Sequence, residues 1–150
     1  MKSPRQRGFV LIAMSVTMLL LLAVLGMAFD LGRVYIARNE AQVFTDAAAM
    51  GAASKLDGTT QGIERARTMV ARVPMKWNLG TEKFTGVIVE FSSDGKKWER
   101  DPKDAGATMA RVTAPSNQVE IFFLRAVGGP ATFTVPARAV AGSNPVRLIQ

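Results

Sequence analysis

The chain lacks two residue types altogether, cysteine and histidine. Without cysteine there is no disulfide, no thiolate nucleophile and no cysteine-ligated metal, and without histidine the commonest general base and metal ligand is missing. The sequence also contains no glycine-rich phosphate loop, no HExxH or GxSxG motif and no EF-hand loop. These absences exclude most catalytic chemistry, and we expect no enzymatic activity, no cofactor and no metal site.

Acidic residues are scarcer than basic ones, since 12 aspartates and glutamates stand against 19 lysines and arginines, for a formal net charge of +7. Binding to a nucleic-acid backbone needs a continuous basic face. Beyond the first few positions, the basic residues here are interleaved with acidic ones. We therefore expect no nucleic-acid partner. Three of the positive charges precede a long uncharged run: Lys2, Arg5 and Arg7.

The uncharged run covers residues 9–29, where only Ser15 and Thr17 carry hydroxyl groups. A helix crosses the roughly 30 Å hydrocarbon core of a bilayer with about 20 apolar residues, so this run is long enough to span. The excess of basic residues before it places the N-terminus in the cytoplasm. We predict a basic leader at residues 1–8, a transmembrane helix at 9–29, a projecting helix at 30–56 and a small extracytoplasmic domain at 57–150.

The N-terminal segment has three alternative interpretations, all of which export the C-terminal part. It is a signal cleaved after Ala28, a permanent anchor, or a leader of the type IV prepilin kind. The junction between Gly8 and Phe9 resembles the prepilin cleavage site, in which a short basic leader ends in glycine and the mature chain begins with phenylalanine. Mature pilins typically carry glutamate at their fifth residue, which here is Ala13. We expect the leader to be retained.

The helix is expected to continue without a break from the span to residue 53, because no proline interrupts it. Apolar side chains recur at spacings of three or four and mark one face: Val34, Ala37, Ala41, Phe44, Ala48 and Ala52. Asp30 and Arg33 can pair on one side of the helix, and we expect them to mark the water boundary. The alanine-rich residues 47–53 permit either close contact between helices or packing on the chain's own domain.

The C-terminal part reads as a mixture of short elements. We predict a helix at residues 63–73 ended by Pro74, and a hairpin of residues 87–91 and 96–100 about the turn at 92–95. Further strands are predicted at 108–114, stopped by Pro115, and at 131–142, where Pro136 indicates an edge or a bulge. Residues 119–127 fit a helix or a strand, and we favour the helix. The fold class is α+β, with the long helix on a small, mainly antiparallel sheet.

Several features, in this order, resemble the N-terminal region of the TadE/TadG-like proteins of Flp (Tad) pilus assembly. They are the basic start ending in Gly8, the span, the stretch containing Asp30, Gly32, Arg33 and Tyr35, and residues 42–53. The closing residues 137–142 are similar to a strand that often ends such domains. The resemblance implies a bacterial, inner-membrane-anchored, pilin-like accessory protein of a thin adhesive pilus. It also implies pilus-assembly subunits as partners and self-association through the N-terminal helix.

Two functional hypotheses follow. The first is a membrane-anchored structural or accessory component of Flp (Tad)-type pilus assembly, held by residues 9–29 in contact with inner-membrane lipid. The second is an exported soluble binding module released by signal peptidase after Ala28. The order of the N-terminal features favours the first hypothesis.

Overall fold

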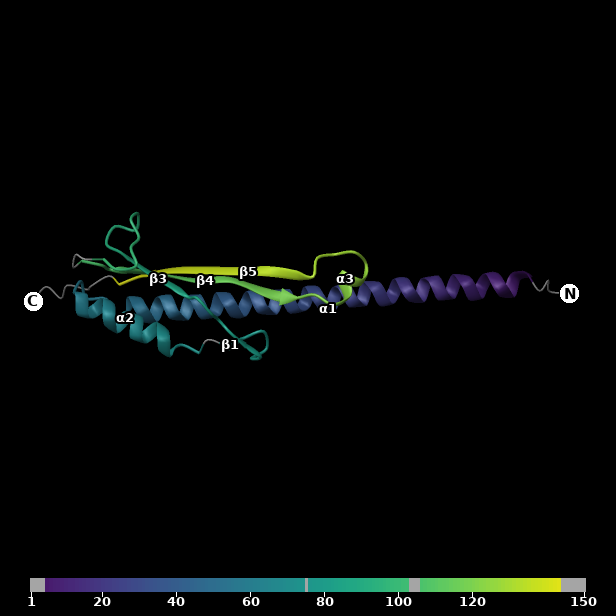
Figure 1. Ribbon diagram of the computed structural model, residues 1–150, viewed down its shortest axis with the longest axis horizontal. Coiled ribbons are helices and arrows are strands. Elements are labelled where there is room, and N and C mark those ends of the chain that lie inside the picture. The colour runs from purple at the N-terminus through teal and green to yellow at the C-terminus, as the bar shows by residue number, and fades with distance from the viewer. Residues whose placement is uncertain (1–4, 75, 103–105, 144–150) are drawn as a thin grey trace, which may run out of the picture.

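The computed structural model describes residues 5–74, 76–102 and 106–143. A single helix, α1 (Arg5–Ala53), runs along most of the longest dimension of the molecule. Its 49 residues correspond to about 74 Å at about 1.5 Å per residue. The first half of α1 projects alone, and the second half lies against the other elements (Figure 1). The prediction of an unbroken helix is confirmed.

The remaining elements follow α1 in chain order. Helix α2 (Thr60–Arg72) leads to the short strands β1 (Lys76–Trp77) and β2 (Glu82–Lys83), which pair with each other. Strands β3 (Ile88–Ser92), β4 (Met109–Glu120) and β5 (Thr132–Gly142) form an antiparallel sheet in the order β3-β4-β5. A one-turn helix, α3 (Phe123–Ala126), lies between β4 and β5. The predicted α+β class is confirmed. We call the described residues from 57 onward the sheet domain.

The core lies between α1 and the sheet domain. The predicted apolar face of α1 is buried there, with Ala37, Ala41, Ala48 and Ala52 fully inaccessible. Phe44 stacks on Phe84 with ring centroids 4.7 Å apart, and Phe84 stacks in turn on Trp77. Most of the alanine-rich segment therefore packs on the chain's own domain. Small side chains at these positions let the strands approach the helix closely.

Two neighbouring alanines of α1 provide a test of this packing. Ala48 is buried and Ala47 is exposed. We expect Ala48→Leu to lower the free energy of unfolding of the sheet domain by about 1–3 kcal/mol, because extra methylene groups do not fit a closely packed core. Ala47→Leu is expected to change it by less than about 0.5 kcal/mol. Urea titration followed by tryptophan fluorescence measures both, and equal effects at the two positions would refute the packing.

The prediction that a strand stops at Pro115 is wrong, because β4 continues to Glu120. The pairing register with β5 shifts between Ala114 and Asn117, opposite Ala137 and Val135. Proline cannot donate a ladder hydrogen bond, and a bulge leaves a residue unpaired. Pro115 falls within this irregularity, so the strand passes through it. The extra residue of this irregularity lies in β4 and not in β5. Of the two alternatives that Pro136 indicated, the edge position is confirmed, because β5 is an edge strand of the described sheet.

The predicted hairpin is only partly formed. Residues 96–100 do not form a strand, and an isolated bridge joins Phe91 to Glu99. The main partner of β3 is β4, along five residue pairs. The Asp94 carboxylate accepts the backbone N–H groups of Lys96 and Lys97 at 2.8 and 3.0 Å. Those two donors are thereby committed to the turn, which limits pairing of this segment with β3.

Helix α2 begins at Thr60, three residues before the predicted start. The Thr59 hydroxyl caps it by accepting the backbone N–H of Gly62 at 3.0 Å. The helix ends at Arg72, just before Val73 and Pro74, as expected.

Residues 119–127, for which the sequence allowed a helix or a strand, contain both. β4 extends to Glu120 and α3 begins at Phe123, so the preference for a helix was right only for the second part of this segment.

Candidate functional site at the base of the sheet domain

The connection from β4 to β5 lies beside α1, close to the end of its apolar half (Figure 1). We call residues 121–131, which include α3, the base loop. The backbone N–H of Ile121 donates to the carbonyl of Ala131 at 2.9 Å and closes the loop. Inside it, the N–H of Gly129 donates to the carbonyl of Leu124 at 2.8 Å. The base loop is therefore a hydrogen-bonded unit at the end of the domain nearest the apolar helix.

Asp30 fastens the base loop to α1. Its side chain is only 1% exposed, and its carboxylate oxygens accept three consecutive backbone N–H groups. Oδ1 accepts from Phe122 at 3.2 Å, and Oδ2 accepts from Phe123 at 2.8 Å and Leu124 at 2.7 Å. These donors are the unpaired N–H groups at the start of α3, where phenylalanine itself provides no acceptor. The expectation that Asp30 only marks the water boundary is wrong, because its carboxylate caps the N-terminus of α3.

Arg33, one helical turn further on, binds the segment just before α3. Its Nη1 donates to the carbonyl oxygen of Glu120 at 3.1 Å. Its guanidinium carbon lies 5.0 Å from the centroid of the Phe122 ring, within the range of a cation–π contact. Asp30 and Arg33 lie on one side of α1 as expected, and both of them hold the base loop.

Gly26 lies within the uncharged run, yet it is buried. A Cβ atom at this position would lie 2.6 Å from Cβ and Cγ of Phe123, a distance that side chains do not adopt. The ring of Phe123 also meets the ring of Phe29 edge to face, with centroids 5.9 Å apart. Gly26 therefore provides the space in which Phe123 approaches the helix.

Comparison with known protein families gives a match for α1. Residues 8–55 match the family described as putative Flp pilus-assembly TadE/G-like. The match covers about a third of the chain and includes Gly26, Asp30 and Arg33, but not the base loop that they bind. No curated protein and no solved structure matches the chain. The TadE/G-like segment and its long apolar helix fit a pilus-related membrane component.

The structure separates the four residues of the predicted TadE/G-like motif. Asp30 and Arg33 meet at the base loop, whereas Tyr35 is 67% exposed. Apart from its chain neighbours and the adjoining backbone of α1, no atom of the described residues lies within 4 Å of a Cβ built on Gly32. The candidate cleavage residues, Gly8 and Phe9, lie far along the projecting half of α1 and are exposed.

Sequence reasoning missed Gly26, Phe122 and Phe123. Gly26 lies two residues before Ala28, the candidate signal-peptidase position, and no local pattern indicates its contact with another segment. The two phenylalanines were read as the interior of a helix in the ambiguous segment 119–127. The available signal was the pair Gly128 and Gly129 after them, because Gly128 has φ +90° and marks a sharp turn. A one-turn helix between two strands leaves its aromatic residues outside the core.

Two glycines of the TadE/G-like segment give opposite expectations for the same substitution. At Gly32, which is open, alanine is expected to stabilise the protein by about 0.4–1 kcal/mol, because it restricts the unfolded chain. At Gly26 the new methyl group collides with Phe123, so Gly26→Ala is expected to displace the base loop and destabilise the sheet domain. Thermal unfolding in detergent micelles measures both signs. A stabilising Gly26→Ala would contradict the described contact.

A second exposed feature follows the outer side of α1. Phe29, Ile36, Val43 and Met50 recur every seven residues and are all exposed, with Val43 at 67%. We call these four residues the outer stripe. A seven-residue repeat is the spacing with which one helix packs along another. The outer stripe is therefore suited to contact with a helix of another chain.

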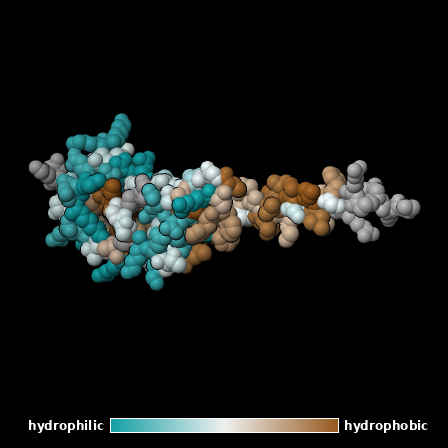
Figure 2. Space-filling model, turned by 45° about the vertical axis from the view of Figure 1, so that its right-hand side comes forward, coloured by the Kyte–Doolittle hydropathy of each residue, from teal (hydrophilic) through white to brown (hydrophobic). Residues whose placement is uncertain are grey.

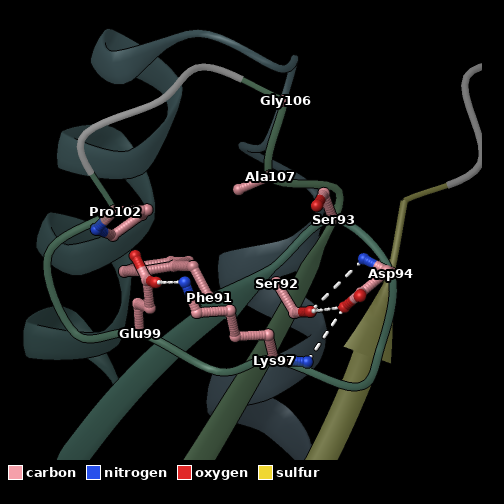
Figure 3. A pocket seen from close by; sticks show the side chains of 9 residues that line it. All are labelled: Phe91, Ser92, Ser93, Asp94, Lys97, Glu99, Pro102, Gly106 and Ala107. Atoms are coloured by element: carbon pink, nitrogen blue, oxygen red, sulfur yellow. Dashed lines mark hydrogen bonds and ion pairs between the residues drawn. The ribbon is translucent and has the colours of Figure 1, made fainter.

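A pocket of about 180 Å³ opens at the other end of the sheet domain, beside the turn after β3 (Figure 3). The Ser92 and Asp94 side chains, which line it, form hydrogen bonds within the turn. Ser92 Oγ donates to Asp94 Oδ1 at 3.0 Å and accepts the N–H of Gly95 at 2.9 Å. The N–H groups of Lys97 and Lys96, with Ser92, hold the pKa of the Asp94 carboxyl below its usual value. Ser92 and Asp94 therefore stabilise the turn after β3.

Proposed function

We propose that the chain is a membrane-anchored structural or accessory component of Flp (Tad)-type pilus assembly. The observation that carries this proposal is the division of the TadE/G-like helix into two halves. The first half exposes an apolar segment long enough to span a membrane, and the second half packs on the sheet domain. Figure 2 displays this contrast, with the apolar helix projecting from a largely hydrophilic domain. In this proposal residues 9–29 span the bacterial inner membrane.

The topology we propose places the N-terminus in the cytoplasm and the sheet domain in the periplasm. The basic residues before the span support this orientation. We also propose that the leader ending at Gly8 is retained, since Ala13 replaces the carboxylate that would pair with a new ammonium group at Phe9 in a bundle of pilin helices. Catalysis, a cofactor and a nucleic-acid partner form no part of the proposed function.

A pilus-assembly family implies interaction with other pilus components. We propose that the outer stripe makes this contact, with either another pilus subunit or a second copy of the chain. Membrane anchoring would align all such helices in parallel and at the same height. Apolar residues at a seven-residue spacing then meet along the half of α1 that carries the sheet domain.

The alternative, release after Ala28, receives less support from the contacts. Cleavage there would cut α1 in mid-helix and remove Gly26, against which Phe123 packs. The cut would also leave Asp30 in the frayed first turn of the new helix, although its carboxylate caps α3. The sheet domain thus uses residues on both sides of the supposed cleavage site, which supports the anchor.

Gene deletion with complementation tests the proposed function. We expect deletion in the producing cell to eliminate Flp-type pili counted by electron microscopy, and the full chain to restore them. Val43→Asp, which places a charge on the outer stripe, is expected to fail although the protein accumulates normally. Thr68→Asp, at an exposed position of α2, serves as the matched control and is expected to restore pili. Normal piliation in the deletion strain would refute the proposal.

A further inference from the structure

The base loop exposes large apolar side chains where the sheet domain meets the apolar half of α1. Phe122, Phe123 and Val127 are 54%, 49% and 58% exposed. Leu25 and Phe29 of α1 are exposed at the same end of the domain. Figure 2 shows apolar surface continuing from the projecting helix onto the adjoining end of the domain. Contiguous apolar surface of this kind marks contact with a partner or a membrane.

The position of the base loop relative to the membrane follows from its contacts with α1. Phe123 packs on Gly26, three residues inside the end of the apolar segment at Phe29. At about 1.5 Å per residue, this contact lies roughly 4–5 Å to the membrane side of Phe29. The three hydrogen bonds to Asp30 prevent the loop from moving away along the helix. When residues 9–29 span a bilayer, the loop is held at its boundary.

The charges of the loop fit a phospholipid surface. Residues 121–131 contain no acidic residue, and Arg125 is their only charged residue. Its long side chain can place the guanidinium at the level of lipid phosphates while its stem stays among apolar groups. Phenylalanine is common on the apolar face of segments that lie in the same interface. The composition therefore matches a lipid interface, where apolar rings and a cation are accommodated together.

We propose that the base loop is a second membrane contact, in which Phe122, Phe123 and Val127 enter the phospholipid interface of the leaflet on the domain's side. Arg125 binds lipid phosphate at the edge of this contact. The inference rests on the proposed anchoring by residues 9–29. Because one helix alone leaves a domain free to tilt and rotate, the second contact fixes the direction in which the outer stripe faces along the membrane.

Single-cysteine labelling tests this contact in the full-length protein, since the chain contains no natural cysteine. Val127→Cys, Leu21→Cys and Val43→Cys are each labelled with an environment-sensitive fluorophore and reconstituted into phosphatidylethanolamine–phosphatidylglycerol vesicles. Quenching is measured with nitroxides attached to the lipid at headgroup depth and deep in the acyl chain. Val43, about 21 Å beyond Phe29 along α1, is an exposed control outside the bilayer.

We expect the label at Val127 to be quenched at least fivefold more than that at Val43, and more by the headgroup nitroxide than by the deep one. The label at Leu21 is expected to respond most to the deep nitroxide. Val127 behaving like Val43 while Leu21 is quenched would overturn the lipid contact and leave the anchor intact. A Val127 label shielded from water but not quenched by lipid would indicate a protein partner, which also overturns it. An unquenched Leu21 label would refute the anchor and, with it, this inference.

Discussion

Leu21→Arg is expected to produce the largest loss of membrane insertion among single substitutions in this chain. Leu21 lies near the middle of the apolar segment, and its side chain is 59% exposed. An arginine at the centre of a spanning helix costs roughly 2.5–3.5 kcal/mol on insertion scales. The fraction of protein that remains in the membrane pellet after alkaline carbonate extraction should therefore fall sharply.

Two controls separate insertion from other effects. Leu21→Ala keeps the position uncharged. We expect it to make the free energy of membrane insertion less favourable by under about 1 kcal/mol and to leave the fraction in the membrane pellet near that of the parent chain. Arg33→Ala changes a charge outside the segment, so it should weaken the hold on the base loop without reducing insertion. Insertion of Leu21→Arg at the level of the parent chain would show that residues 9–29 do not face lipid.

Asp30→Ala is expected to cause the largest loss of order in the base loop. The substitution removes the acceptor of the backbone N–H groups of Phe122, Phe123 and Leu124, whose hydrogen bonds are partly buried. A partly buried donor left without an acceptor is more costly than a lost surface hydrogen bond. We expect the thermal midpoint of the sheet domain to fall by on the order of 10 °C. Hydrogen exchange should show that these three amides lose their protection.

Asp46→Ala is the matched control, since Asp46 is an exposed carboxylate on the same helix and accepts a hydrogen bond from the neighbouring Gln42 side chain at 2.9 Å. It should leave the midpoint and the exchange pattern of the base loop unchanged. Asp30→Asn is expected to be intermediate, because an amide retains one oxygen acceptor. Unchanged protection of the three amides in Asp30→Ala would contradict the capping role.

Much of the architecture could be predicted because it depends on local patterns. The absence of proline and the spacing of Ala37, Ala41 and Phe44 were enough to predict one long helix and its buried face. The strands of the sheet were located to within a few residues, apart from the continuation of β4. That continuation depends on the register shift between Ala114 and Asn117, within which Pro115 lies. Such a shift is a property of the pairing of two distant segments and not of either sequence alone.

The site was less predictable for a related reason. Asp30 looked like a charge just outside a span, and such charges ordinarily only meet water. Its actual partners are N–H groups about 90 residues later in the chain. Gly26 likewise has a structural role only because the connection between β4 and β5 places Phe123 against it. Contacts of this sequence separation follow from topology and could not be read from periodicity.

Protease accessibility combined with carbonate extraction tests the membrane-anchored account most directly. A C-terminally tagged chain is followed in intact cells and in spheroplasts. The account predicts that the full-length chain stays in the membrane pellet, that its sheet domain is digested in spheroplasts, and that it is protected in intact cells. Recovery of the domain in the soluble periplasmic fraction, with Phe29 as its first residue, would contradict the account.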